Sequence, residues 1–270
     1  MKSLNAFVIA GAFLLPSMTH GGFGNVVGSF PAPGLGPIGL ARSNEYLFVL
    51  AAMEAGPQRG LRLIYRVNPE TGSVKNAYLA PDGGKENYGG LAYTVPAQIW
   101  IPNNTRDIVY KLNAVNGSII DSWLCNPGVL NGIAADHNQA RGGPVNAIWV
   151  SSGLPDMFRK YTPKGVLITE YMWGMRTSDI GWDYDASQFW AGSFNAPYYV
   201  YRFTSIGSIS ASFRSPAVNS AVSASEYYER YLWLATSETE IEEVPYIWKV
   251  DVTEVGVDPA SLGRVKALFR

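Results

Sequence analysis

Side chains able to act as nucleophiles or soft metal ligands are scarce in this sequence. It contains one cysteine, Cys125, and two histidines, His20 and His137. An intrachain disulfide and a thiolate metal cluster are therefore excluded. A nucleophilic triad is nearly excluded as well, since we expect Cys125 and His137 at opposite ends of one strand. Oxygen donors are plentiful, so a calcium-type metal site remains open.

Aromatic side chains are abundant, with 8 Trp, 16 Tyr and 11 Phe. Several fall in predicted loops, close to Asn, Asp and Ser. They are Tyr88, Trp173, Phe194, Tyr198, Tyr227 and Tyr228. Exposed rings of this kind stack on sugar rings or hold a partner chain. The alternative is that these rings plug the mouth of a channel or the edges of sheets.

A repeated β unit must position these side chains. A small-residue strand, an aromatic strand and a strand with a cation recur in the same order, at a mean period of about 46 residues. The aromatic strands contain Phe48, Trp100, Trp149, Trp190 and Trp233, and the third strands contain Arg66, Lys111, Lys160, Arg202 and Lys249. A fourth strand follows most turns. The pattern predicts an all-β fold, a β-propeller of four-stranded blades. The alternative, a β-sandwich, does not require the aromatic and the cation to recur in phase.

The blades are expected to stack through the aromatic of the second strand, which fills the space between neighbours. We expect the five cations of the third strands to be solvated blade surface. Five blades fit the sequence, and six blades are the alternative. Asn25–Phe30 resembles a fourth strand with no blade before it, so we expect it to pair with the last blade and close the ring. Residues 264–269 compete for that position.

The loops that enter each blade are expected to form one rim of the central channel, together with the loops between second and third strands. Ligand sites in propellers are expected on such a rim. The polar loop 81–89 and the loop 173–179 both lie there. We expect the ligand-binding residues of the rim to be Tyr88, Glu86, Trp173, Asn131 and Arg176.

The length, the repeats and the N-terminus predict an exported protein with one domain. Hydrophobic residues make up 47% and charged residues 16%, with 28 Gly and 17 Pro, as in a β protein rich in turns. A net charge of -1 disfavours nucleic acid as a partner. Lys2, an apolar run from Ala6 to Leu15 and small residues after it predict a signal peptide over 1–22, too short to span a bilayer. We expect residues 23–270 to form a single propeller domain, a secreted or periplasmic bacterial monomer without a transmembrane segment.

The segment Leu130–Asp136, followed by Ile148–Val150, resembles the Asn-Gly segment of the gluconolactonase and senescence-marker propeller family. The resemblance implies that Asn131 is a divalent-metal ligand, and that Asp179, one blade later, is both ligand and catalytic base. It covers two segments and the repeat pattern. The early Glu ligand of that family would fall near Gly36, where there is no carboxylate, and Ser151–Ser152 replace another acidic residue. Glu86 is the candidate for a third ligand.

Two further resemblances concern the blades. Tyr88–Tyr93 resembles the blade opening of plant-type glutaminyl cyclases, which are five-bladed propellers, although Gly replaces the expected Glu. The repeat as a whole is similar to exported bacterial propellers grouped with streptogramin lyase and quinoprotein-like repeats. Those families share a fold without sharing chemistry. The quinoprotein likeness implies no cofactor here, because its specific ligands are not found in the sequence.

Two functions follow from these observations. The first is a non-catalytic propeller that binds a carbohydrate or a protein on its loop rim. The second is a metal-dependent hydrolase or lyase of the lactonase type, with calcium at the channel mouth. The second predicts that Asn131, Asp179 and Glu86 converge within roughly 5 Å of one point. The sequence favours the first.

Overall fold

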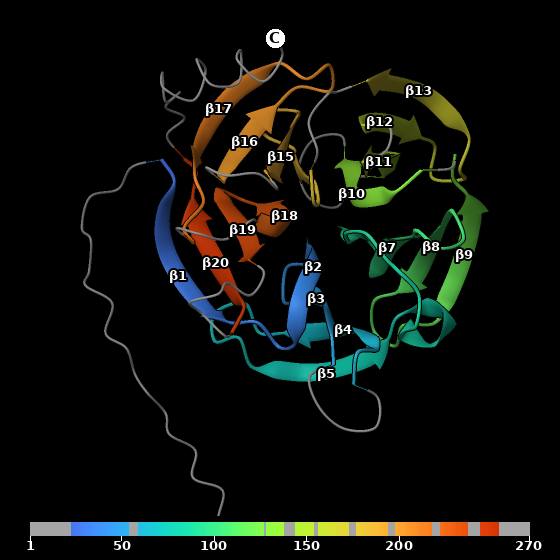
Figure 1. Cartoon of the computed structure of the whole chain (residues 1–270), viewed down its shortest axis with the longest axis horizontal. Coiled ribbons are helices and arrows are strands. Elements are labelled where there is room, and N and C mark those ends of the chain that lie inside the picture. Colours follow the sequence, from blue (N-terminus) through green and yellow to red (C-terminus); the bar gives the residue numbers. More distant parts are fainter. Residues whose placement is uncertain are drawn as a thin grey trace, which may run out of the picture.

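The computed structural model describes residues 23–53, 59–126, 128–137, 144–153, 156–172, 177–193, 198–217, 222–236 and 244–253. Its strands form five antiparallel four-stranded sheets around a central axis (Figure 1). The prediction of a five-bladed propeller is confirmed. No helix in these ranges is long and apolar enough to cross a membrane.

The first four blades each follow the chain from the axis outward. Blade one contains β2 (Leu35–Arg42), β3 (Leu47–Ala52), β4 (Arg62–Val67) and β5 (Val74–Leu79). After the 3-10 turn η1 (Pro81–Gly84), blade two contains β6 (Ala92–Thr94), β7 (Gln98–Asn103), β8 (Ile108–Asn113) and β9 (Ile119–Leu124). Blade three contains β10 (Leu130–His137), β11 (Val145–Gly153), β12 (Asp156–Tyr161) and β13 (Leu167–Met172). Blade four contains β14 (Gly181–Asp183), β15 (Gln188–Gly192), β16 (Tyr199–Phe203) and β17 (Ile209–Arg214).

The fifth blade joins the two ends of the propeller. It contains β18 (Val222–Tyr228), β19 (Tyr231–Thr236) and β20 (Tyr246–Asp251), and its outer strand is β1 (Asn25–Pro31) from the start of the fold. Figure 1 shows β1 lying outside β20. The predicted closure is therefore confirmed. The competing segment 264–269 lies outside the described residues, as does the predicted signal peptide.

The core is divided into five clusters, one at each seam between adjacent blades. Trp100 packs on blade three, Trp149 on blade four, Trp190 on blade five and Trp233 on blade one. Phe48 fills the remaining seam. All five rings are at most 4% exposed, so equivalent aromatics do occupy equivalent seams.

The third-strand cations differ from the expectation of solvated surface. Each is the direct cross-strand partner of its blade's aromatic, for example Trp149 opposite Lys160. Their side chains are half-buried, because four of them lie over the indole that they oppose, at 5.1 to 5.7 Å from its ring centroid. These cations therefore cover the seams, a favourable use of the electron-rich ring face.

Candidate functional site

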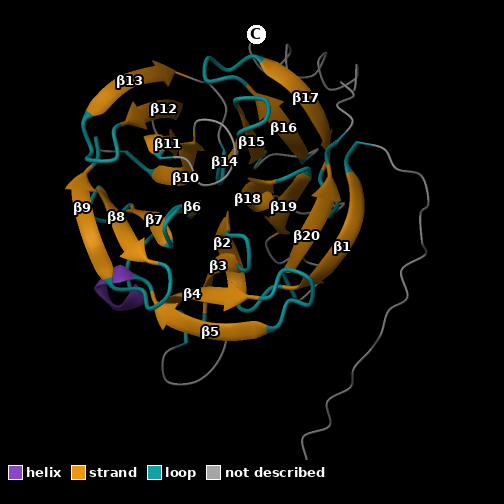
Figure 2. Cartoon of the chain, turned by 180° about the vertical axis from the view of Figure 1, so that it is seen from behind, coloured by secondary structure: helices purple, strands orange, loops and turns teal. Residues whose placement is uncertain are grey.

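The inner strands of the blades line the axis. At one equivalent position on these strands, four blades have a small residue and the fifth has a carboxyl side chain. This position pairs directly with the seam aromatic of the second strand. Its occupants, in blade order, are Ala41, Ala92, Ala134, Gly181 and Glu226. Four small residues suit the crowded centre that Figure 2 shows, where β2, β6, β10, β14 and β18 converge. Glu226 places a carboxyl where every other blade has at most a methyl group.

A second carboxyl lies two positions earlier, on or just before the inner strands, where three blades have glycine. The occupants there are Gly39, Gly90, Gly132, Asp179 and Ala224. Asp179 is fully buried, and its carboxyl accepts backbone N–H groups from three blades. Ile180 and Ile133 donate to Oδ1 at 2.9 and 3.4 Å, and Leu40 donates to Oδ2 at 3.4 Å.

The space that the Asp179 carboxyl fills is left by glycine. A Cβ on Gly90 would lie 1.7 Å from Oδ1 of Asp179, and one on Gly132 would lie 2.7 Å from its Cα. Burial raises the pKa of Asp179 well above its usual range, and the Glu226 carboxylate adds to the rise, while the backbone N–H groups oppose it. The Asp179 carboxyl thus links the inner-strand region of three blades through the backbone N–H groups that it accepts.

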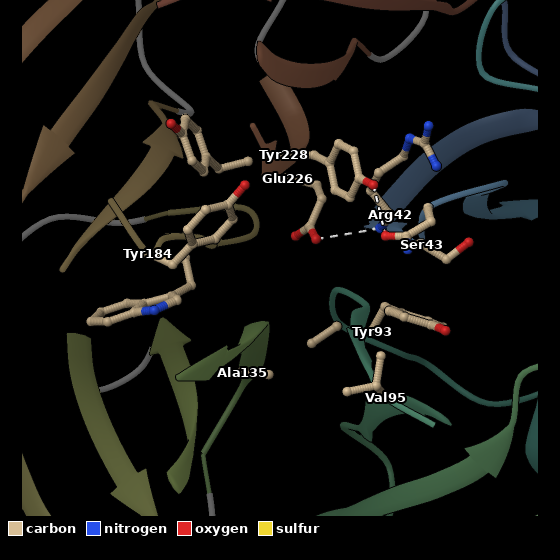
Figure 3. Close-up of a pocket in the computed structure, with 12 residues that line it drawn as sticks. Arg42, Ser43, Tyr93, Val95, Ala135, Tyr184, Glu226 and Tyr228 are labelled. Atoms are coloured by element: carbon tan, nitrogen blue, oxygen red, sulfur yellow. Dashed lines mark hydrogen bonds between the residues drawn. The ribbon is translucent and has the colours of Figure 1, made fainter. Parts of the chain in front are cut away.

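Glu226 lies beside a cavity at the mouth of the channel, called here the aromatic cup. Five rings line the cup: Tyr93, Trp182, Tyr184, Tyr227 and Tyr228. Figure 3 shows the Glu226 carboxyl between Tyr184 and Arg42. The cup has a volume of about 60 Å³, which leaves room for a few heavy atoms of a larger ligand.

The environment of Glu226 favours its neutral form. Burial raises the pKa of Glu226 well above its usual range, and the backbone N–H and guanidinium of Arg42 oppose the rise. That N–H donates to Oε1 at 3.3 Å, as the dashed line in Figure 3 marks. A protonated carboxyl has one donor and further acceptor capacity, so Glu226 offers a ligand both whenever it carries its proton.

Hydrogen bonds hold the rings of the cup in place. The Tyr228 hydroxyl donates to Asn44 at 2.8 Å, and the Arg42 guanidinium lies 4.5 Å from the Tyr228 ring centroid. The Tyr227 hydroxyl donates to Asp185 at 2.6 Å. The backbone N–H of Glu229 donates to the Tyr184 hydroxyl at 2.7 Å. Because these contacts order the rings before a ligand binds, less binding free energy is lost in ordering side chains on binding.

The cup is at the opposite mouth from the predicted rim. Its residues end the inner strands or follow them: Arg42 ends β2, Tyr184 follows β14 and Tyr228 ends β18. The predicted rim residues Glu86 and Tyr88 instead precede an inner strand. The inner strands lie side by side around the axis and run in the same direction. The residues that precede an inner strand and the residues that end or follow one therefore lie at opposite ends of the channel.

The described rim residues have structural partners. Tyr88 is 4% exposed and its hydroxyl donates to the Pro81 carbonyl. Glu86 is 3.5 Å from the Arg106 guanidinium. Asn131 donates from Nδ2 to the Thr177 carbonyl at 2.9 Å. Trp173 and Arg176 lie outside the described residues.

The structure brings Asn131 and Asp179 to adjacent inner strands, since Gly132 abuts Asp179. Glu86 is engaged elsewhere, in the loop that also contains Asp82. No group of three His, Cys, Asp or Glu side chains with metal-binding geometry occurs within the described ranges. Ligation of calcium by Asn131, Asp179 and Glu86, and a catalytic role for Asp179, stay predictions.

The remaining soft nucleophile is also engaged. Cys125 is 6% exposed, and its Sγ lies 3.2 Å from the Tyr161 hydroxyl. Burial raises the pKa of the Cys125 thiol, which disfavours the reactive thiolate. The side chain of His137 lies outside the described residues.

Sequence reasoning missed Glu226 because the inner strand of blade five was placed at Ala221–Ser223, ahead of its true register. A usable signal was present. In blades one, two and four the small residue lies seven to nine positions before the seam aromatic. The same count back from Trp233 reaches Glu226.

Comparisons with known proteins support the fold. No protein-family model and no curated protein sequence matches the chain. A glutaminyl cyclase of Myxococcus xanthus is similar in structure, with TM-score 0.58 and 11% identity, over 86% of this chain and 98% of that one. Virginiamycin B lyase of Staphylococcus aureus covers 81% of this chain and 72% of its own, with 18% identity and TM-score 0.46. The expected likeness to propeller repeat proteins is confirmed, while chemistry must be argued from the site.

Proposed function

We propose that this propeller is a binding protein for a neutral, hydroxylated ligand, such as a sugar residue of a glycan, and that one edge of this ligand enters the aromatic cup. The observation that carries this proposal is the replacement of a channel-wall Ala or Gly by Glu226. The half-buried Glu226 carboxyl accepts the backbone N–H of Arg42, whereas the Asp179 carboxyl accepts three backbone N–H groups and ties three blades together.

The chemistry of the cup matches a sugar better than an ion. Aromatic faces cover the apolar C–H faces of a sugar ring, and a few polar groups fix its orientation. A neutral Glu226 both donates to and accepts from a hydroxyl group. A cationic ligand would instead require the ionised carboxylate, which burial disfavours.

Titration calorimetry with cellobiose and diacetylchitobiose tests the proposal. Glu226→Gln keeps the shape, the donor and the acceptor, so we expect affinity within about threefold of the native protein. Glu226→Ala loses a buried hydrogen bond of about 1–2 kcal/mol, and we expect affinity to fall about 5- to 30-fold. Equal affinities of the native protein and Glu226→Ala would contradict the proposal.

Acid–base catalysis is the second candidate, favoured by the raised pKa of Glu226 in an apolar site beside another carboxyl. One structurally similar protein is a glutaminyl cyclase, so cyclisation of an N-terminal glutaminyl peptide is a reaction to assay. Glu226→Gln separates the candidates. A catalyst would lose turnover in this variant, whereas a binding protein shows no turnover in either form.

The metal-dependent alternative is tested separately at Asp179. If calcium binds Asn131, Asp179 and Glu86, calcium chloride raises the thermal midpoint of the native protein and leaves that of Asp179→Ala unchanged. Because backbone N–H groups already occupy the Asp179 carboxyl, we expect no calcium-dependent shift in either protein.

A further inference from the structure

A second cavity adjoins the aromatic cup and is called here the side groove. It has a volume of about 310 Å³ and lies over blades one and two. Tyr46, Phe48 and Arg66 line its blade-one side. Four residues line both cavities: Ser43, Asn44, Tyr93 and Val95. The aromatic cup and the side groove therefore lie next to each other, with these four residues between or around them.

Arg66 is the cation that lines the side groove. It is the third-strand cation of blade one, and three of its four counterparts have a carboxylate partner. Those ion pairs are Lys160 with Asp136 at 3.0 Å, Arg202 with Asp183 at 3.7 Å and Lys249 with Glu70 at 3.0 Å. No ion pair of Arg66 occurs among the residues that the structure describes.

The guanidinium of Arg66 is positioned without being neutralised. It lies 3.7 Å from the centroid of the Tyr46 ring, and its Nε is buried with no hydrogen-bond partner in the described part of the chain. Glu45 also lines the groove and is exposed, and no ion pair between Glu45 and Arg66 occurs among the described residues. Stacking on the Tyr46 ring holds the planar guanidinium in place, and a guanidinium binds a carboxylate through two parallel hydrogen bonds.

We propose that the side groove is an anion subsite, and that the ligand carries a carboxylate next to the neutral ring held in the cup. The ligand class is then an acidic glycan containing a uronic acid. This inference rests on the proposed function, because the cup selects the sugar and Arg66 selects its charge. A carboxylate in the groove would give the Arg66 guanidinium the kind of anionic partner that the equivalent cations of three other blades have.

Two disaccharides that differ in one group test the subsite. Cellobiouronic acid carries a carboxylate where cellobiose carries a hydroxymethyl group. At matched ionic strength we expect the native protein to bind the acid at least tenfold more tightly. Arg66→Gln should abolish this preference, so that the two disaccharides bind with about equal affinity. Arg66→Lys should retain part of the preference, because lysine keeps the positive charge but cannot form two parallel hydrogen bonds to a carboxylate.

Lys111→Gln is the matched control, since Lys111 is the third-strand cation of blade two and lies over Trp100 outside the groove. It should keep the full preference. The absence of a preference in the native protein would overturn the inference, as would a preference that survives in Arg66→Gln. Cellobiose binding that depends on Glu226 would leave the proposed function standing in either case.

A probe without a sugar tests the subsite if neither disaccharide binds, an outcome that would reject the proposed function. Sodium benzoate and benzamide are then compared by nuclear magnetic resonance titration of the native protein and Arg66→Gln. Benzoate-specific shifts at Tyr46 that disappear in Arg66→Gln support the anion subsite. Equal responses to the two probes, or shifts retained in Arg66→Gln, overturn it.

Discussion

Asp179 and Glu226 are the two residues that break the small-residue pattern of the channel wall. Burial raises the pKa of both carboxyls well above their usual range. They differ in their neighbours: backbone N–H groups from three blades surround Asp179, whereas Glu226 faces a cavity. A buried acid with its hydrogen bonds satisfied stabilises structure, and one that faces a cavity is available to a ligand.

The raised pKa values give stability a definite dependence on pH. In the unfolded chain both groups ionise near pH 4, but in the folded protein they keep their protons to higher pH. The unfolded state therefore binds fewer protons over that interval, and stability falls as pH rises through it. Thermal midpoints measured from pH 4.5 to pH 8 should fall less steeply in Glu226→Gln than in the native protein. Parallel curves would show that Glu226 ionises normally.

Gly90 tests whether the Asp179 carboxyl fills the axis. In Gly90→Ala the new methyl group would overlap the carboxyl of Asp179, so we expect destabilisation by about 3 kcal/mol, measured by urea unfolding. Gly28→Ala is the control, because its Cβ has its nearest neighbour at 3.9 Å. That variant should be neutral or slightly more stable. A mild effect at Gly90 would mean that the carboxyl lies elsewhere.

Among the elements, the second and third strands of each blade form the unit that seals a seam. In blades two to five the aromatic of the second strand is covered by the cation directly opposite on the third. The order of these residues along the chain predicted the strands, because alternation and spacing are local properties. The position of each cation over the aromatic ring was not predicted, because it depends on the register between the second and third strands.

Seam tryptophans should differ in their tolerance of phenylalanine. The Trp190 indole donates to Asp183 at 3.0 Å, whereas Nε1 of Trp149 is buried without a partner among the described residues. Trp190→Phe therefore leaves a buried carboxyl short of a donor, and Trp149→Phe removes an unsatisfied group. We expect Trp190→Phe to cost about 1–2 kcal/mol more, measured by urea unfolding. Equal costs would contradict this account of the two seams.

At the scale of the whole molecule, β1 converts an array of blades into a ring. It pairs with β20, and Phe30 joins the seam cluster that contains Trp233. Deletion of residues 23–31 would expose the edge of β20 and open that seam. We expect the truncated chain to lose its single cooperative thermal transition and to aggregate, as scanning calorimetry and light scattering would show. A truncated monomer with the native midpoint would refute closure by β1.

The sequence predicted the ring but favoured ligand binding at the other mouth of the channel. Repeats identify blades, and loop composition directs attention to Glu86 and Tyr88, whose side chains hold the entry loop of blade two. The aromatic cup combines Arg42, Tyr93, Tyr184 and Glu226 from four blades. No local pattern joins residues so distant in sequence, so the cup emerges only when the ring is closed.

The most direct test of the account is the affinity for cellobiose as a function of pH, in the native protein and in Glu226→Gln. If the neutral Glu226 carboxyl donates to the sugar, affinity in the native protein declines as pH rises and that carboxyl ionises. Glu226→Gln has no proton to lose there, so its affinity stays constant over the same range. Identical pH profiles for the two proteins would contradict the assignment of the aromatic cup as the binding site.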